Sequence, residues 1–418
     1  MQSTTSKESK PARITALWFG VQLIWGAVLG ISLQARYLQL TSGSSLELFG
    51  WISASGAGAA AITQLVVGPI SDAMRRRGRG RGAFYAAGAL LGAVAILAFY
   101  ASSSVYGLLG SFVALQIALN IIIGPYQAII PDLIPPQRFG VASAWLAAMG
   151  SAGNACGAIL ATLLGGTLRL GLALAAGLLA SASITILYSR RLPMQPLSPA
   201  ASFTANRTLV DLFVSRAFVY LGFYTILLYL YFFVASILPH GFALDATRTT
   251  GLCVLLFTVV GALGALLAAR PADRSDERLV VSVGGCLVAL SLAVLAQIHA
   301  MGALVPAIAL AGVGWGIFLC ADWAFACRLL PPAALATRMA IWNLAVVGPQ
   351  MLAPLVATVT LSQLGVLRNA MGPRDALLLG GAEMLIGTLW IWRLPGAPRG
   401  HKAYGHDCME PKQGDHAL

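Results

Sequence analysis

The sequence Gly68-Pro69-Ile70-Ser71-Asp72-Ala73-Met74-Arg75-Arg76-Arg77-Gly78-Arg79-Gly80-Arg81 lies between two apolar segments, each long enough to cross a lipid bilayer. It holds five arginines in the seven positions 75–81, and charge at that density cannot lie in hydrocarbon. Short basic loops are retained on the cytoplasmic side of a membrane. We therefore place this stretch in the cytoplasm, which fixes the direction in which every other segment crosses.

The composition is that of a polytopic membrane protein. Of the 418 residues, 58% are hydrophobic and only 10% are charged, and the mean hydropathy is +0.79. A soluble domain carries roughly 25% charged residues. The net charge of +12 resides in short loops between apolar runs, so it indicates membrane topology and not a nucleic-acid partner.

Other classes of function lack their chemical groups. The six cysteines show no metal-ligand spacing, and the five histidines all fall in predicted loops or the polar C-terminal segment. We therefore expect no metal site and no cofactor. A membrane enzyme would need a nucleophile–histidine set or a metal motif at the interface, and ATP-driven transport would need a Gly-x-x-x-x-Gly-Lys-Ser/Thr loop. The sequence contains none of these.

Twelve segments have the roughly 20 mostly apolar residues that a spanning helix needs. They are residues 14–38, 48–69, 83–102, 105–130, 140–164, 168–188, 209–237, 248–269, 279–298, 303–327, 339–361 and 376–393. With both termini in the cytoplasm, 21 lysines and arginines fall inside and 4 outside. A different number of crossings would destroy this bias.

The two halves of the chain repeat. Asp132-Leu133-Ile134-Pro135-Pro136 precedes the fifth segment, and Arg328-Leu329-Leu330-Pro331-Pro332 precedes the eleventh, 196 residues later. Two six-helix repeats around a central cavity are a common transporter architecture. We expect an N-terminal six-helix bundle at 1–190, a cytoplasmic linker at 191–208, a C-terminal six-helix bundle at 209–395 and a polar cytoplasmic tail at 396–418.

With these motifs in place, the membrane portion resembles the major facilitator superfamily, whose signature between its second and third helices is Gly-x-Leu-Ala-Asp-Arg-x-Gly-Arg-Arg. Residues 68–81 resemble one copy and residues 269–278 a second, with Asp276 where glycine is usual. The resemblance implies an all-α membrane protein with the major facilitator fold: twelve transmembrane helices in two six-helix pseudo-symmetric bundles, both termini cytoplasmic. It also implies transport by alternating access.

Within the superfamily, the six-residue spacing of Asp72 and Gly78 resembles the sucrose–proton and glycoside–pentoside–hexuronide cation symporter branch. Asn120 followed by Gly124-Pro125 resembles the fourth helix of that branch. The sucrose group has an aspartate and an arginine in this helix where the present chain has Gln116 and Gln127. The resemblance therefore implies a carrier without identifying its coupling ion.

By the same resemblance the first, fourth, seventh and tenth helices line the cavity. Amides both donate and accept hydrogen bonds, and aromatic faces stack on apolar ring faces, so a stripe of both suits a neutral hydroxylated solute. Packing between helices is the alternative role for such side chains. The candidate solute-binding residues are Gln22, Trp25, Gln116, Asn120, Gln127, Tyr220, Tyr224, Trp315, Asp322 and Trp323.

Charges inside the membrane are costly and mark functional sites. We expect Asp322 to titrate protons or to pair with Arg216, with snorkelling to the interface as the alternative. By resemblance Asp72 latches the two halves on the inside in the outward-open state. The candidate coupling or gating residues are Asp322, Arg216, Arg36, Asp72, Arg79 and Asp273.

Glycines in two segments favour close helix contact. They are Gly150, Gly153 and Gly157 in the fifth segment and Gly261 and Gly264 in the eighth. By resemblance these two helices meet between the halves.

The sequence predicts a secondary active transporter of a small organic solute, sugar-like or another polar metabolite, with proton symport as the first choice. A proton-driven exporter (antiporter) of a metabolite or drug is the alternative. The expected partners are the solute, protons and the lipid bilayer. We expect a monomeric multi-pass protein of a bacterial cytoplasmic (inner) membrane.

Overall fold

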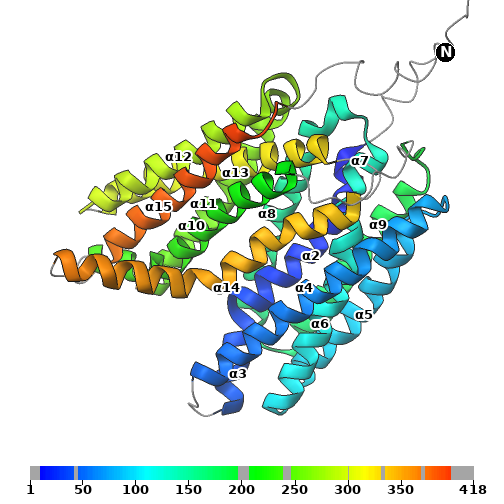
Figure 1. The fold of residues 1–418 in the computed structure, drawn as a ribbon. Helices are drawn as coiled ribbons and strands as arrows, with labels where there is room; N and C mark the ends of the chain where they lie inside the picture. Colours follow the sequence, from blue (N-terminus) through cyan, green and yellow to red (C-terminus); the bar gives the residue numbers. More distant parts are fainter. Residues whose placement is uncertain are drawn as a thin grey trace, which may run out of the picture.

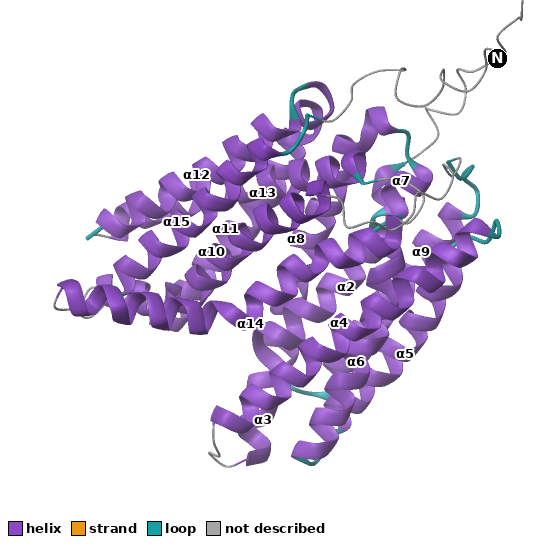
Figure 2. Cartoon of the chain, in the orientation of Figure 1, coloured by secondary structure: helices purple, strands orange, loops and turns teal. Residues whose placement is uncertain are grey.

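The computed structural model describes residues 10–41, 46–195, 207–238, 246–299, 301–330, 335–368 and 372–396. The described part is helical apart from short turns (Figure 2). Most of the predicted linker 191–208 and nearly all of the predicted tail 396–418 lie outside the described residues.

Long helices match the twelve predicted crossings. In chain order the helices are α1 (Pro11–Ile14), α2 (Ala16–Ala27), α3 (Leu33–Thr41), α4 (Leu46–Arg76), α5 (Gly82–Ala101), α6 (Val105–Tyr126), α7 (Ile129–Leu133), α8 (Phe139–Leu164), α9 (Leu168–Ser189), α10 (Arg207–Ile237), α11 (Ala246–Arg274), α12 (Glu277–Gln297), α13 (Leu304–Leu329), α14 (Leu335–Arg368) and α15 (Pro373–Trp390). Nine helices in the described part are long and apolar enough to cross a bilayer. The other crossings are α4, α14 and the interrupted first helix.

The first predicted helix, 14–38, is interrupted twice. It breaks at Thr15, where the backbone N–H of Leu17 donates to the hydroxyl of Thr185 on α9 at 2.9 Å. A π-helical turn over Val28–Ser32 then joins α2 to α3. The predicted continuous helix 105–130 is also wrong, because α6 ends at Tyr126 and α7 begins at Ile129. Pro131 has no N–H to donate to the carbonyl four residues earlier, which interrupts the ladder.

Most of the basic stretch 68–81 is helical. α4 continues through Pro69 to Arg76, and only residues 77–81 form the turn to α5. Gly78 ends the helix with φ of +73°, the left-handed region that favours glycine. The N–H of Arg79 donates to the carbonyl of Met74 at 3.1 Å, which satisfies one of the last helical carbonyls.

The helices form two bundles of six crossings. In the first, α2 packs on α8 and α9, and α5 packs on α6 and α9; in the second, α10 packs on α14 and α15, and α13 packs on α11 and α12. Between the bundles, α8 contacts α11 and α13, and α4 contacts α14. In Figure 1 the bundles are close near α7 and diverge toward α3 and α15.

One end of the molecule carries the basic turns, and we call it the basic end; it comprises the turn 77–81, residues 134–138, residues 190–195 and the turn 275–276. Both ends of the described chain lie there. The N–H of Lys10 donates to the Tyr188 hydroxyl at 2.7 Å, and Arg278 donates to the Leu394 carbonyl at 3.1 Å. The positive-inside rule predicts that this end faces the cytoplasm.

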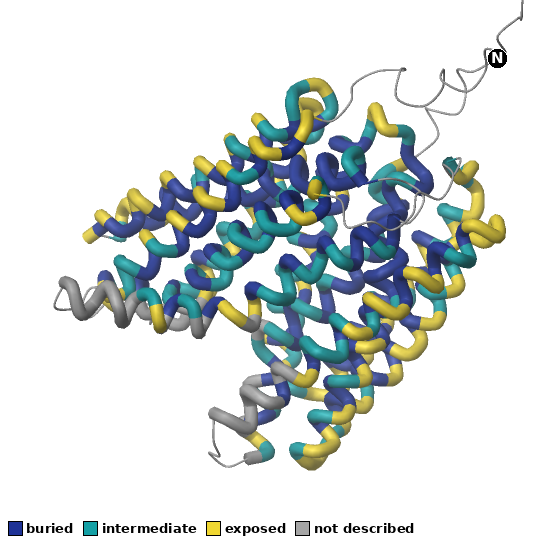
Figure 3. Tube along the Cα trace, viewed as in Figure 1, coloured by how far each residue is buried: buried dark blue, intermediate teal, exposed yellow. Residues whose placement is uncertain are grey.

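Buried side chains face the helix contacts, while exposed apolar ones cover the outside (Figure 3). Leu163 and Leu267 are 74% and 72% exposed. This pattern indicates that lipid, and not water, surrounds the helices, because in water these large apolar side chains would be exposed to solvent.

The five glycines predicted for close contact on the fifth and eighth crossings lie against helices of their own bundle and not of the other one. A Cβ at Gly157 or Gly153 would meet the backbone of α2, and a Cβ at Gly264 would lie 2.9 Å from Val313 Cα on α13. α8 and α11 do contact each other across the interface, as expected. The glycines nevertheless serve each helix's contact with its own bundle, where the backbones approach most closely.

Candidate functional site

The basic end is closed by a carboxylate of each bundle that caps a helix of the other. Asp72, in the last two turns of α4, accepts hydrogen bonds from the N–H groups of Ala336 and Thr337 at 3.2 and 2.9 Å and from the Thr337 hydroxyl at 2.7 Å. These groups form the first turn of α14, where backbone N–H groups lack helical partners. A carboxylate there also meets the positive end of the helix dipole. Asp72 thus occupies the position expected of a latch.

The second bundle returns the same contact. Asp273, at the end of α11, accepts from the N–H groups of Gly140 and Val141 at 2.6 and 3.1 Å, in the first turn of α8. Gly140 and Ala336 are 196 residues apart, so the two caps are related by the internal repeat. We call Asp72 with the α14 N-terminus the first latch, and Asp273 with the α8 N-terminus the second latch.

Ion pairs beside the latches occur at equivalent positions of the two halves, but the cation and the anion have exchanged places. In the first bundle Arg81 pairs with Asp72 at 3.0 Å and with Asp132 at 2.6 Å. In the second, Arg328 pairs with Asp273 at 2.8 Å and also with Glu277. Arg81 and Glu277 are 196 residues apart, as are Asp132 and Arg328. The repeat therefore preserves the pairing while exchanging which helix supplies the cation.

Arg81, and not the predicted Arg79, pairs with the carboxylate of the first latch. Arg79 is exposed and forms no ion pair with any described residue, whereas Arg81 is 5% exposed. The left-handed turn at Gly78 directs the chain outward at Arg79 and back inward at Arg81, which precedes α5. Burial lowers the pKa of Arg81, but Asp132 and Asp72 outweigh burial, and the net effect is a raised pKa. Arg81 therefore remains a cation.

A second group of charges lies away from the two latches, inside the second bundle. Arg216 on α10 donates to Asp322 on α13, and the two side chains are only 3% and 2% exposed. This is the predicted pair. The Arg216 guanidinium also lies 4.9 Å from the ring centre of Tyr220 and 3.5 Å from that of Trp342. Aromatic faces stabilise a buried cation in such positions.

Amide side chains join the first bundle to the second. The Gln64 amide nitrogen on α4 donates to the Asn120 oxygen on α6 at 2.5 Å. The Gln64 oxygen accepts from Gln127 at 3.4 Å and from Asn343 on α14 at 3.2 Å. We call these four residues the amide cluster. Asn120 also donates to the Gln116 carbonyl at 2.7 Å, so the Gln116 side chain itself lies outside the cluster.

Aromatic rings fill the space around the buried pair. Trp315 stacks on Phe223 with ring centres 4.4 Å apart and meets Tyr220 edge-on at 5.4 Å. Tyr220 in turn contacts Tyr224 at 6.2 Å. Trp315 and Tyr220 are 7% and 8% exposed. Three of the four predicted aromatic residues on α10 and α13, Tyr220, Tyr224 and Trp315, therefore form one packed group.

Tryptophans also connect the bundles. Trp18 on α2 lies 6.1 Å from Trp323 on α13 and 6.3 Å from Trp25. Four buried N–H groups in this region have no hydrogen-bond partner among the described residues: the indole nitrogens of Trp25, Trp323 and Trp342, and Nε of Arg216. Native proteins rarely bury such donors unpaired, so each one is a candidate to bind an acceptor atom of a solute or of water.

Two predicted residues lie apart from these groups. Arg36, near the end opposite the gate, donates to the backbone oxygens of Tyr100 and Ser102, which ties α3 to the end of α5 within one bundle. It is not brought to the buried pair or to the latches. Gln22 is half-buried on α2, facing Gly150 of α8 and outside the amide cluster.

Sequence reasoning missed Gln64, Asn343, Trp342 and Glu277 as site residues. Glu277 could have been found, because the 196-residue repeat makes its position equivalent to that of Arg81. The other three lie on α4 and α14, helices that we did not search for cavity-lining residues. In the described part of the chain no cluster of three metal-ligating side chains occurs.

Comparison with known proteins agrees with this architecture. The sequence matches the profile of the Major Facilitator Superfamily over residues 16–354. A search of curated proteins found no match. A bacterial homologue of the iron transporter ferroportin in an outward-facing state superposes with a TM-score of 0.69 at 15% identity, covering 92% of this chain and 98% of that one.

Two further solved structures show the same fold. The human organic anion transporter MFSD10 gives a TM-score of 0.68 at 14% identity, covering 92% of this chain and 100% of its own. The proton:xylose symporter XylE bound to 6-bromo-6-deoxy-D-glucose gives 0.64 at 13% identity, covering 92% and 95%. Since the profile spans most of the sequence, this chain belongs to the major facilitator superfamily: it is a multi-pass membrane protein, a secondary transporter of a small solute and not an enzyme.

Proposed function

We propose that this chain is a proton-coupled symporter of a neutral, oxygen-rich small solute, in the manner of a sugar carrier. One observation carries the proposal: the buried Arg216–Asp322 pair lies among donors that have no partner in the described chain. An aspartate can accept a proton, and the unpaired donors can bind the hydroxyl and ether oxygens of a solute.

The pair supplies a means of coupling. Two charges in a low-dielectric site stabilise each other, and removing one leaves the other costly to bury. Protonation of Asp322 would remove its charge and release Arg216, which stays held by the rings of Tyr220 and Trp342. The freed guanidinium would then bind an acceptor atom of the solute, so that proton and solute favour the same state.

The amide cluster supports the choice of a neutral hydroxylated solute. Gln64, Asn120, Gln127 and Asn343 hydrogen-bond to one another, and the buried side-chain oxygen of Gln127 has no partner among the described residues, so a solute entering here must replace the existing bonds and can also donate to that oxygen. Hydroxyl groups can do so because they donate and accept, as amides do. A purely apolar solute would leave the amides unpaired at a cost of about 1–3 kcal/mol for each group.

We infer that the arrangement is outward-facing. Both latches close the basic end, and the bundles diverge away from it (Figure 1). The similar ferroportin homologue is described as outward-facing, and the major facilitator transporter FucP, whose structure has a TM-score of 0.65 at 10% identity, is described as being in the outward conformation. Transport then requires both latches to open while the opposite end closes.

A proton-driven exporter is the second candidate. The packed rings of Tyr220, Phe223, Trp315 and Phe257 present apolar ring faces beside the buried pair. Such a surface suits an aromatic metabolite or drug. Asp322 would then exchange its proton for the compound instead of moving with it.

Three finer assignments are part of the proposal. The Asp72-to-Gly78 spacing supports the sucrose–proton and glycoside–pentoside–hexuronide branch. The basic end supports insertion in a bacterial cytoplasmic membrane with both termini inside. A transport route between the two bundles of one chain supports a monomer as the working unit.

The test is transport by purified protein in liposomes under an imposed pH gradient. A panel of sugars and polyols is first screened by thermal shift to choose the solute. We expect an inward proton gradient to drive accumulation in the wild type. Asp322→Asn should reduce that accumulation more than tenfold while retaining solute exchange at equal pH. Asp211→Asn is the control, because Asp211 is also on α10 but binds Trp390 at 3.0 Å.

The outcomes separate the candidates. Expulsion of the solute when protons enter would identify an exporter. Accumulation by Asp322→Asn that is unchanged in size and pH dependence would refute the coupling role of the pair.

A further inference from the structure

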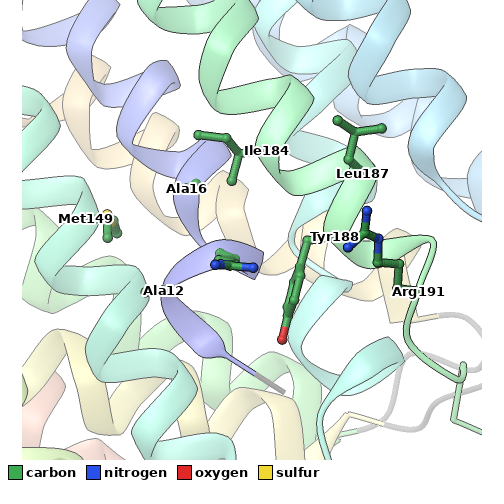
Figure 4. A pocket seen from close by; sticks show the side chains of 8 residues that line it. Ala12, Ala16, Met149, Ile184, Leu187, Tyr188 and Arg191 are labelled. Carbon is green, nitrogen blue, oxygen red and sulfur yellow. The ribbon is translucent and has the colours of Figure 1, made fainter. Parts of the chain in front are cut away.

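A pocket of about 580 Å³ lies at the basic end of the first bundle, away from the transport site. It is bordered by α1, the start of α2, α8 and α9 (Figure 4). Tyr188 and Arg191, at the end of α9, lie on one side, and Met149 of α8 lies on the other. The hydrogen bond from the Lys10 N–H to the Tyr188 hydroxyl places this pocket where the chain enters the membrane.

Two cations line the pocket without a countercharge. Arg13 and Arg191 are exposed, and neither forms an ion pair with any residue that the structure describes. The Arg13 guanidinium lies 5.5 Å from the ring centre of Tyr188, which holds it at the pocket. None of the lining residues is acidic. The carboxyl end of α9 adds a partial negative charge nearby, about half an elementary charge, which two full positive charges exceed.

The remaining wall is apolar and open toward lipid. Ile184 and Leu187 on α9 are 48% and 59% exposed, and both border the pocket. Their helix is an apolar membrane-spanning segment. A ligand in this pocket therefore meets cations at the water boundary and hydrocarbon immediately beside them.

We propose that the pocket binds an anionic phospholipid of the cytoplasmic leaflet, with the phosphate between Arg13 and Arg191 and the first carbons of an acyl chain along Ile184 and Leu187. Basic pockets between transmembrane helices on the cytoplasmic side bind such headgroups. A free phosphate would use the arginines but leave the apolar wall without a role. The volume lies in the range of small-ligand pockets.

Bound there, the lipid contacts the first helix, α8 and α9 at once. α8 begins at the second latch, because Asp273 caps its first turn. The lipid therefore stabilises α8, the helix whose first turn forms the second latch, but it does not enter the transport site.

The experiment measures lipid binding to delipidated protein by native mass spectrometry in an equal mixture of dioleoylphosphatidylglycerol and dioleoylphosphatidylcholine. We expect the wild type to retain phosphatidylglycerol. Replacing both arginines, Arg13→Gln with Arg191→Gln, should weaken that binding roughly 30-fold, as the loss of two surface charges predicts. The control is Arg77→Gln with Arg190→Gln, which removes two exposed charges from the same end but none from the pocket.

Each possible result either supports or overturns the lipid site. Equal loss in the pocket variant and the control would show that diffuse charge attracts the lipid, and would overturn the site. Glycerol phosphate that raises the melting temperature as much as phosphatidylglycerol would overturn the lipid assignment in favour of a soluble phosphate. If the glutamine variant fails to fold, Arg13→Lys with Arg191→Lys retains the charges. Binding by the lysine variant supports the proposal, and no preference for phosphatidylglycerol in that variant overturns it.

Discussion

Replacing Asp72 by asparagine tests whether the first latch holds the outward-facing state. The carboxylate accepts three hydrogen bonds from the start of α14 and pairs with Arg81 at 3.0 Å. Asparagine keeps one oxygen but loses the charge, so the helix dipole and Arg81 lose their partner. A charge-assisted hydrogen bond contributes about 1.5–3 kcal/mol, and we expect the closed basic end to lose about 2–3 kcal/mol of stability.

This loss acts on a conformational equilibrium, since the latch exists only while the basic end is closed. A change of about 2–3 kcal/mol shifts the ratio of states roughly 30- to 150-fold. From a ratio of about 1:99, the inward-open population would rise to roughly 25–60%. Net transport should slow, because the cycle needs the outward-open state to reform, while the amount of folded protein in the membrane stays nearly unchanged.

Double electron–electron resonance between spin labels on cysteines at positions 190 and 393 would measure the shift. Both positions are exposed at the basic end, one on each bundle. We expect Asp72→Asn to add a longer distance to the distribution. The matched control is Asp375→Asn, because Asp375 caps α15 within one bundle, accepting from the Gly372 N–H at 2.8 Å. A wild-type distribution in Asp72→Asn, or an equal change in the control, would refute the latch.

Three further predictions follow from the same contacts. Arg81→Gln should destabilise the fold by about 3–5 kcal/mol in thermal or denaturant unfolding, because Asp72 loses its ion-pair partner and Asp132 keeps only the longer contact with Arg75 at 3.4 Å. Arg81→Lys retains the positive charge and should lose less stability, and an equal loss in the two variants would contradict the role of the charge. Gly140→Val should separate the second latch, since a Cβ there would lie 2.6 Å from a backbone oxygen of α11. The buried Cys320 thiol donates to the Gly140 carbonyl, so its alkylation should then accelerate at least tenfold. An unchanged alkylation rate would be evidence against this separation. Gln64→Leu should lower the melting temperature by a few degrees, because three amide side chains each lose a hydrogen bond to Gln64, at about 1–3 kcal/mol for a buried group left unsatisfied.

The fold could be predicted because the membrane reduces the problem to length and charge. Each crossing needs a long apolar run, and basic loops report which side they face. The sequence could not give the breaks within crossings. Leu17 leaves the helical ladder for the Thr185 hydroxyl on α9, a partner 168 residues away, and only the packed structure brings the two together.

The site residues could be predicted where their side chains are of a type that is rare inside a membrane. Arg216 and Asp322 stood out because charge is rare inside a membrane, and the pair forms. Arg79 was placed wrongly because the linear motif does not show which way side chains point after the left-handed turn at Gly78. Gln64 and Asn343 were missed because one amide among many polar residues carries no signal until its partners across the interface are known.

α14 connects the gate to the interior, and the connection has no counterpart in the other half. Thr337 at its start is held by the first latch, and Trp342 and Asn343 follow within six residues, about 9 Å along the helix. Trp342 lies on Arg216, while Asn343 binds Gln64. The positions 196 residues earlier on α8 are Leu146 and Ala147, which have no polar side-chain group to make such contacts. Opening the first latch therefore moves α14 against both the buried pair and the amide cluster, whereas the equivalent positions on α8 make no polar side-chain contact, so Asp72→Asn should alter solute affinity more than Asp273→Asn does.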